Sequence, residues 1–190
     1  GDNVQLQDVL DESIERARAI IEEKNPDLPA DEKEEIARTV GLGAIKYAEL
    51  SQHRLTDYVF SWDKMLSLQG NTAPYLMYSY VRIQSIFRKA GQVAFRGVNP
   101  ELSSPEERAL ALKLTQFGES LPGTLADHRP NLLANYLFEL ATTFHSFFEA
   151  CPVLKSEGRI QHTRLMLCEV TAHVLKTGLS LLGIKVPSRM

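Results

Sequence analysis

Helical periodicity along almost the whole chain is the feature that most constrains its fold. Apolar residues recur at the spacing of one helical face in several long stretches, whereas the alternation typical of strands is nearly absent. A chain of 190 residues, 44% of them hydrophobic, can bury a sizeable core. We therefore predict an all-α helical bundle of five or six helices, and the lack of strands excludes a Rossmann sheet within these residues.

Capping signals and glycines mark where helices begin and pack. Thr72 is a predicted N-cap with Pro74 in the turn that follows, and Ser104-Pro105-Glu106-Glu107 has the composition of a capping box. Gly41 and Gly43 lie inside a helical stretch, where glycine is unfavourable. We expect these two glycines to allow close approach of a neighbouring backbone.

The segments between helices are also recognisable. We predict a connector over residues 51–70 and a loop over residues 91–103, and we expect residues 118–130, which contain Pro122 and Pro130, to kink or interrupt a helix. The predicted helices cover approximately residues 9–24, 30–50, 73–90, 105–117, 131–149 and 159–182.

Charge is distributed unevenly, although the net charge is only −3. Residues 1–35 contain twelve acidic and four basic residues, whereas residues 64–100 contain five basic residues and no acid. Residues 151–190 contain six basic and two acidic residues. An acidic leader before a basic body is typical of a protein with a polyanionic partner, and solvated helix faces are the alternative explanation.

The stretch from Gly70 to Ala90, GNTAPYLMYSYVRIQSIFRKA, combines aromatic and basic residues without an acid. On a helical wheel, Leu76, Tyr80, Ile83 and Phe87 fall within an arc of about 60°, which predicts a core stripe. A second arc of about 80°, well separated from the first, gathers a different set of side chains. Its members are Tyr75, Tyr78, Arg82, Ser85 and Lys89.

This second face has the chemistry that single-stranded RNA recognition requires. Unstacked bases lie against tyrosine rings, and guanidinium groups reach phosphates or base edges. The alternative is that Tyr75 and Tyr78 fill a second packing seam while Arg82 pairs with an acid. A further alternative is a helical protein–protein interaction module that uses this face to bind an acidic partner.

Longer strings of the sequence closely resemble the arginyl-tRNA synthetase family. The matching strings are VGLGAIKY, R-x-x-D-Y-x-F-x-W-x-x-M-L from Arg54 to Leu66, G-N-T-A-P-Y-L-x-Y from Gly70 to Tyr78, RPNLLANYLFELATTFHSFFEACPVL from Arg129 to Leu154, and the terminal LLGIKVPSRM. They follow one order and cover nearly the whole chain. The resemblance implies a class I enzyme that activates arginine with ATP and Mg and transfers it to arginine tRNA in the cytoplasm.

The resemblance also implies that this chain is the C-terminal part of such an enzyme. The family's HIGH-type and KMSKS-type signatures belong to a Rossmann catalytic domain, and we find neither here. In the family, the KMSKS-type loop lies just upstream of a segment that resembles VQLQDVLDESIERA, here Val4 to Ala17. The resemblance therefore implies a chain that starts directly after this catalytic loop. We therefore expect no catalytic residue, no cofactor and no activity in this chain alone. Its expected partners are the upstream catalytic domain and the anticodon loop of arginine tRNA, and we expect the full-length protein to be a monomer.

The family's DALR anticodon-binding domain is expected over residues 75–190, after a helical tail of the catalytic region and a connector over residues 1–74. By resemblance, Tyr75, Tyr78 and Arg82 contact the anticodon loop, and Met190 lies near it. Lys89, on the same predicted face, is expected to hold phosphates. Some relatives place aromatic residues in the loop before the last helix, but the loop here, residues 152–156, has none. A tRNA-binding paralogue that never joins a catalytic domain remains an alternative.

The remaining polar residues give weaker signals. The spacings of His162, Cys168 and His173 do not put ligands neatly on one helical face, so we predict no metal site. His145 lies among phenylalanines and is expected to be packed rather than catalytic. Cys151 and Cys168 suit buried thiols. No apolar run approaches the roughly 18 residues that a membrane span needs, so we expect no membrane partner and a cytoplasmic protein.

Overall fold

The computed structural model describes residues 5–91 and 97–190, and within these ranges the secondary structure is helical without strands. The prediction of an all-α bundle is therefore confirmed for the described residues. The predicted loop of residues 91–103 falls partly outside them, as does Arg96 of the basic segment. The described helices are α1 (Leu6–Lys24), α2 (Ala30–Leu50), α3 (Trp62–Met65), α4 (Ala73–Ala90), α5 (Pro105–Thr115), α6 (Phe117–Ala126), α7 (Pro130–Ala150) and α8 (Gly158–Leu181).

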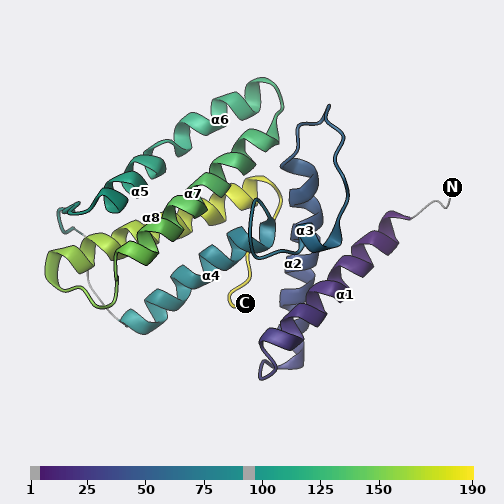
Figure 1. Ribbon diagram of the computed structural model, residues 1–190, viewed down its shortest axis with the longest axis horizontal. Helices are drawn as coiled ribbons and strands as arrows, with labels where there is room; N and C mark the ends of the chain where they lie inside the picture. Colours follow the sequence, from purple (N-terminus) through teal and green to yellow (C-terminus); the bar gives the residue numbers. More distant parts are fainter. Residues whose placement is uncertain (1–4, 92–96) are drawn as a thin grey trace.

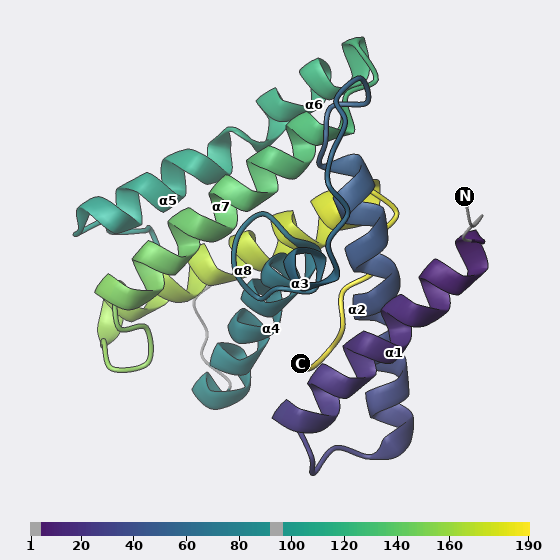
Figure 2. The same ribbon diagram turned by 45° about the vertical axis from the view of Figure 1, so that its right-hand side comes forward.

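The long helices pack in two groups (Figure 1). Helices α1 and α2 form a hairpin on one side, and α2 connects this hairpin to α4 and α7. Helices α4, α7 and α8 pack against one another, and α5 and α6 lie along α7. After α8 the chain returns to α2, so the C-terminal residues lie between α4 and the hairpin (Figure 2).

The two glycines of α2 that the sequence singles out have different neighbours: Gly41 lies against α1, and Gly43 faces α4. A Cβ atom on Gly41 would lie 2.8 Å from the backbone oxygen of Ser13 and 2.9 Å from Cα of Ile14. A Cβ atom on Gly43 would lie 2.4 Å from Cε of Met77. The expectation of a close backbone is confirmed at Gly41, where α1 approaches α2 at a distance that a larger residue would prevent. At Gly43 the close neighbours are side chains, so a neighbouring backbone is not what this glycine admits.

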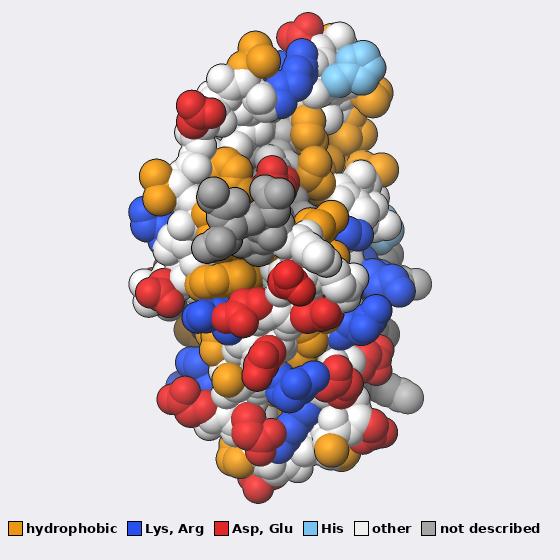
Figure 3. Space-filling model, turned by 90° about the vertical axis from the view of Figure 1, so that its right-hand side faces the viewer, with side chains coloured by type: hydrophobic (Ala, Val, Ile, Leu, Met, Phe, Trp, Pro, Cys, Tyr) orange, Lys and Arg blue, Asp and Glu red, His pale blue; other side chains and the backbone are white. Residues whose placement is uncertain are grey.

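The acidic leader forms the exposed face of this hairpin. Figure 3 shows acidic and basic side chains interspersed over much of that face. Arg18 and Glu34 pair at 2.6 Å, and Lys33 and Glu22 pair at 2.8 Å, each time joining α1 to α2. Since these acids are largely solvated or paired, the structure supports the explanation of residues 5–35 as ordinary helix faces.

Both predicted caps are present. The Thr72 hydroxyl accepts a hydrogen bond from the backbone N–H of Tyr75 at 3.2 Å and so begins α4. Ser104 and Glu107 form the reciprocal hydrogen bonds of a capping box at the start of α5. Gly91 and Gly183 follow α4 and α8 with φ of +67° and +70°, values that favour glycine.

The predicted number of five or six helices was wrong, because the described residues contain eight. The short α3 falls in the connector, and residues 117–126 form a separate helix with Pro122 inside it. A proline in a helix removes one N–H and clashes with the carbonyl four residues earlier, which here is in the first turn. Side chains supply hydrogen bonds within this helix: the Ser120 hydroxyl donates to the carbonyl oxygen of Phe117, and the Thr124 hydroxyl donates to that of Ser120. The helix also packs on α7.

A fully buried tyrosine joins the hairpin to the remaining helices. Tyr47 of α2 has 1% of its surface exposed, and its hydroxyl lies 2.6 Å from Oδ1 of Asn71 and 2.9 Å from the carbonyl oxygen of Ala134 in α7. Burial raises the pKa of Tyr47, so the ring stays a neutral hydrogen-bonding group. One side chain thereby fixes α2, the residues before α4 and α7 relative to one another.

Candidate nucleic-acid interface

Helix α4 buries a broader surface than the predicted stripe. Leu76 and Ile83 are fully buried as expected, but Tyr80 and Phe87 are only partly buried. The reason is that α4 contacts α2 on one side and α7 and α8 on the other, so residues such as Met77 also become core. The face that carries Tyr75, Tyr78, Arg82, Ser85 and Lys89 is therefore bordered by packed residues.

Tyr75 belongs partly to the packing of the molecule. Its ring meets Phe138 of α7 edge-on, with 5.8 Å between the ring centroids. The packing explanation therefore holds in part for Tyr75: the ring is half-buried against α7, and the rest of its surface remains accessible.

Arg82 is the centre of the candidate interface. Its guanidinium carbon lies 4.7 Å from the ring centroid of Tyr78 and 5.0 Å from that of Phe148 in α7. Nη2 donates a hydrogen bond to the Tyr78 hydroxyl at 2.9 Å, and Nη1 lies 3.3 Å from Nδ1 of His145. Among the interactions of the described residues, no ion pair joins Arg82 to an acid, so the expectation of the packing alternative is not met there.

His145 does not have the packed environment expected for it. Its side chain is 44% exposed and faces Arg82, while Phe144 and Phe147 point into the core. Because arginine can only donate, Nδ1 accepts the hydrogen bond, and the proton sits on Nε2, which is 3.3 Å from Glu149. His145 thereby gives the guanidinium a second hydrogen-bond partner beside the Tyr78 hydroxyl.

A pocket of about 280 Å³ opens beside Arg82, between α4 and the loop that precedes α8. Its apolar walls are formed by residues such as Phe148, Val153 and Leu154. The cationic residues Arg82, Lys89 and Lys155 also line it. The complete lining is Arg82, Ser85, Ile86, Lys89, Phe148, Pro152, Val153, Leu154 and Lys155. A flat apolar surface surrounded by positive charge can receive an unstacked base and its phosphate.

Two contributors to this pocket were missed from the sequence. Phe147 is fully buried, whereas Phe148 is only partly buried against the same core. The reason is that Phe148 follows Phe147 directly, and neighbouring helical residues point about 100° apart. That signal could have identified an outward-facing ring. The loop of residues 152–156 has no aromatic residue that could mark it in the sequence, but Leu154 and Lys155 line the pocket there.

The structure brings together four of the five predicted site residues on one helix, and of the five only Arg82 and Lys89 line the pocket. Tyr75, Tyr78, Arg82 and Lys89 lie on α4, whereas Met190 is half-buried against the core at the end of the chain. The preceding Arg189 pairs with Glu32 of α2 at 3.7 Å. Met190 is not part of the lining beside Arg82.

The described residues also bear on two other features, a metal site and a membrane-spanning helix. Across residues 5–91 and 97–190, no three His, Cys, Asp or Glu side chains gather in a way that could hold a metal ion. In the same residues, no helix combines the length and apolar character needed to cross a membrane.

In sequence and in fold, the chain is similar to known arginyl-tRNA synthetases. Residues 76–190 match the family model described as the DALR anticodon binding domain, and residues 1–62 match that of the class I tRNA synthetase catalytic domain for arginine. An arginine–tRNA ligase of Laribacter hongkongensis is 52% identical over 191 residues, which cover 100% of this chain and 33% of that protein.

Two solved structures give the same picture. An arginyl-tRNA synthetase of Thermus thermophilus superposes with a TM-score of 0.91 at 40% identity, covering 98% of this chain and 32% of that one. The arginyl-tRNA synthetase of Plasmodium falciparum gives a TM-score of 0.85 at 33% identity, covering 98% of this chain and 34% of that one. The chain thus spans about a third of the length of the relatives it matches.

Proposed function

Since the chain belongs to the arginyl-tRNA synthetase family and contains its DALR anticodon-binding domain, we propose that it binds the anticodon loop of arginine tRNA. We propose further that it does so as the C-terminal part of an arginine–tRNA ligase, working in the cytoplasm. The observation that carries the proposal is the contact of the Arg82 guanidinium with the rings of both Tyr78 and Phe148, beside a pocket that Arg82, Lys89 and Lys155 line.

The chemistry of this site suits a cytosine. Every arginine codon has G in its middle position, so every arginine anticodon has C there, and one base can identify all the isoacceptors. The Watson–Crick edge of cytosine offers N3 and O2 as neighbouring acceptors, and a guanidinium presents donors in a planar fork. Tyr78 and His145 hold that fork in place, so less conformational entropy is lost when it binds.

The surrounding cations would bind the phosphates. Lys89 and Lys155 are exposed on opposite sides of the pocket, and Arg88 is exposed beside Lys89 on α4. Such contacts release counterions and therefore weaken as salt is added. Tyr75 would stack a neighbouring base with its accessible edge, and Met190 would meet the loop only if the RNA extends towards the end of the chain.

We also propose the division into residues 1–74, the helical tail of the catalytic region with its connector, and residues 75–190, the anticodon-binding domain. The two family matches support this boundary. Catalysis by the parent enzyme would use ATP with Mg bound elsewhere. A pocket of about 660 Å³ lies beside the connector, but among the described residues that line it the only cation is Lys64, and one lysine does not fit a triphosphate. We therefore derive no catalytic step from these residues, and we expect the chain alone to be inactive.

The experiment that tests the proposal measures binding to arginine tRNA by fluorescence anisotropy. The wild-type chain is titrated with normal tRNA and with tRNA whose middle anticodon base is changed from C to G. Tyr78→Ala and Arg82→Ala are measured in parallel, and Arg88→Ala serves as the control because it removes an exposed arginine from the same helix. Circular dichroism verifies that every variant is folded.

We expect the base change to weaken binding by about tenfold or more, because a donor fork loses its acceptors. Tyr78→Ala and Arg82→Ala should weaken binding to normal tRNA and lose the preference for C, whereas Arg88→Ala should retain it. Equal binding to both tRNAs would show a backbone binder without anticodon readout. The absence of any tRNA binding would instead favour an acidic protein as the partner of this face.

A further inference from the structure

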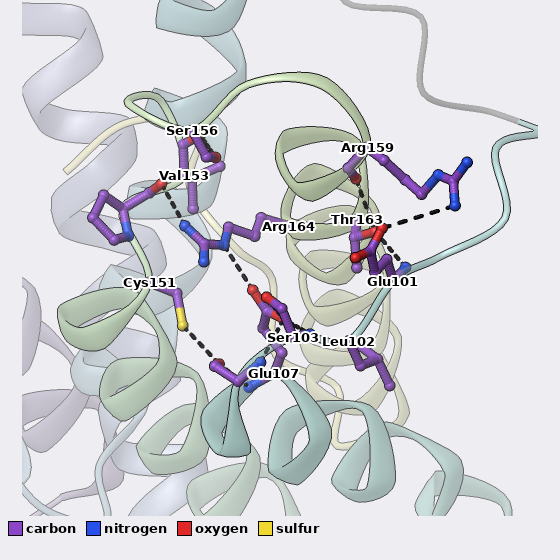
Figure 4. Close-up of polar contacts among 12 residues, drawn as sticks. Glu101, Leu102, Ser103, Glu107, Cys151, Val153, Ser156, Arg159, Thr163 and Arg164 are labelled. Carbon is purple, nitrogen blue, oxygen red and sulfur yellow. Dashed lines mark hydrogen bonds and ion pairs between the residues drawn. The ribbon is translucent and has the colours of Figure 1, made fainter.

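A buried carboxylate organises the region behind the pocket (Figure 4). Glu107 of α5 is fully buried, with 0% of its surface exposed. Its Oε1 accepts a hydrogen bond from Nε of Arg164 in α8 at 2.7 Å. Its Oε2 accepts hydrogen bonds from the backbone N–H groups of Ser103 and Ser104, at 2.6 and 3.1 Å, and from the Ser103 hydroxyl at 3.0 Å.

These partners keep the carboxylate ionised. Burial alone would raise the pKa of Glu107, but the hydrogen bonds from Arg164, Ser104 and Ser103 outweigh it and hold the pKa below its ordinary value. The Arg164 side chain is itself only 13% exposed. The pair therefore joins α5 to α8 in a fixed geometry, since either charge would be costly to leave buried without the other.

The same pair holds the loop that forms the pocket wall. Nη1 of Arg164 donates to the carbonyl oxygen of Pro152 at 3.0 Å, so the guanidinium reaches Glu107 and the loop together. Beside it, Sγ of Cys151 lies 3.2 Å from Oγ of Ser104, the residue that caps α5. These contacts attach residues 151 and 152 to α5 and α8, while the next residues, Val153 to Lys155, line the pocket beside Arg82.

We propose that Glu107 and Arg164 are positioning residues for RNA recognition. They touch no RNA themselves. They fix the loop of residues 151–155 so that Leu154 and Lys155 stand opposite Arg82 and Lys89. The inference rests on the proposed function, because it assigns this wall to the RNA-binding pocket.

The fork of Arg164 is the part that can be tested without removing the buried charge. Arg164→Lys keeps a cation next to Glu107, but a single ammonium on a shorter reach cannot hold the carboxylate and the Pro152 carbonyl in the same way. Arg159→Lys is the matched control. Arg159 also lies on α8 and pairs with an acid, Glu101, at 3.8 Å, but its side chain is 64% exposed and forms no described contact with the loop.

The test combines three measurements on the full 190-residue chain. The first is the dissociation constant for arginine tRNA, with Arg82→Ala as a reference variant for the binding face. The second is the position of the Val153 and Leu154 methyl signals in methyl NMR spectra without RNA, with Leu110 and Leu140 as core references. The third is a double-mutant cycle that combines Arg164→Lys with Leu154→Ala, since coupled residues give non-additive effects.

We expect Arg164→Lys to weaken tRNA binding about fivefold and Arg159→Lys to change it less than twofold. The Val153 and Leu154 methyl signals should shift in Arg164→Lys while the Leu110 and Leu140 signals stay in place, which separates loop displacement from general unfolding. In the background of Leu154→Ala, the effect of Arg164→Lys should shrink, because the wall that it positions is already lost.

Three results would overturn the inference, and each can be distinguished from a failure of the proposed function. If Arg82→Ala weakens binding but Arg164→Lys does not, the pocket binds RNA without needing this positioning. If the affinity falls but the loop methyl signals stay in place, or if the effects of Arg164→Lys and Leu154→Ala simply add, the pair acts elsewhere. If Arg82→Ala has no effect either, the proposed function itself is wrong and the inference falls with it.

Discussion

At the scale of single residues, the placement of Arg82 separates a recognition site from a charged helix face. A surface arginine normally has several rotamers and gains little from one partner. Here two rings, a hydroxyl and an imidazole contact one guanidinium. A planar group held in this way can present its remaining N–H donors in a fixed direction, which is a requirement for reading the edge of one base.

This geometry predicts that lysine cannot replace Arg82. In Arg82→Lys the charge remains, but the planar fork and most of the stacking with Tyr78 and Phe148 are lost. We expect about tenfold weaker binding to arginine tRNA and a smaller preference for C in the middle of the anticodon. Fluorescence anisotropy with both tRNAs measures these effects, and Arg88→Lys is the control at an exposed position. An unchanged preference in Arg82→Lys would show that charge alone recognises the RNA.

The buried Glu107 predicts a dependence of stability on pH. Its pKa is lower in the folded than in the unfolded chain, so its ionised form contributes stability above its ordinary value of 4.5. That contribution disappears as the pH falls through the folded-state value. In Glu107→Gln it is absent at every pH, and Arg164 is left without its counter-charge.

We therefore expect Glu107→Gln to lower the free energy of unfolding by about 3 kcal/mol near neutral pH. The difference from the wild type should narrow below about pH 4, because the wild-type carboxyl group then becomes neutral as well. Urea denaturation at a series of pH values measures this difference. Glu101→Gln is the control, since that side chain is 54% exposed. A difference that does not depend on pH would contradict the account.

At the scale of elements, close approach of helices determines which glycines are indispensable. Gly41 lies against the backbone of α1, so a methyl group there meets atoms that cannot rotate away. Gly123 of α6 differs, because a Cβ atom there would lie 3.6 Å from Cδ1 of Leu132, an ordinary contact. Both positions are helical, and alanine is the better helix former at each.

The two substitutions should consequently have opposite signs. Gly41→Ala is expected to destabilise the chain by about 2 kcal/mol, since overpacking exceeds the gain in helix propensity. Gly123→Ala is expected to stabilise it by about 0.5 kcal/mol, mainly by restricting the unfolded chain. Thermal unfolding followed by circular dichroism distinguishes the two. A stable Gly41→Ala variant would mean that α1 can move away from α2 at little cost.

The difference between local contacts and packing against distant elements also explains which helices could be predicted from the sequence. The starts of α4 and α5 follow from contacts within four residues, which is why Thr72 and Ser104 were identified correctly as caps. Helix α6 was not predicted because Pro122 opposes it locally, and only its packing on α7 overcomes that penalty. Only one wall of the pocket, the face of α4, could be predicted from the sequence. Arg82 and Lys89 share one helical face, but the loop opposite is placed by Glu107, which lies 57 residues from Arg164 in sequence.

At the scale of the whole molecule, the charge distribution means that the proposed RNA binding would have to be local. The chain carries a net charge of −3, so its long-range field does not attract a polyanion. Acids dominate the α1–α2 hairpin, and several cations of the last 40 residues pair with acids: Arg159 with Glu101, Arg164 with Glu107, and Arg189 with Glu32. The electrostatic part of binding must then come from the lysines around the pocket.

This reasoning gives a quantitative expectation for salt dependence. Each phosphate contact with single-stranded RNA contributes roughly 0.7 to the slope of log affinity against log salt concentration. Removing both pocket lysines, in Lys89→Ala with Lys155→Ala, should reduce that slope by about 1.4 and leave the preference for C in the middle anticodon base intact. Lys176→Ala with Lys185→Ala is the matched control, since these lysines do not line the pocket. Binding titrations from low to high salt give the slopes. An equal loss of slope in the two double variants would mean that the RNA is held by the general positive charge of the C-terminal region, and the lysines at the pocket would then have no special role in orienting the anticodon loop over Arg82.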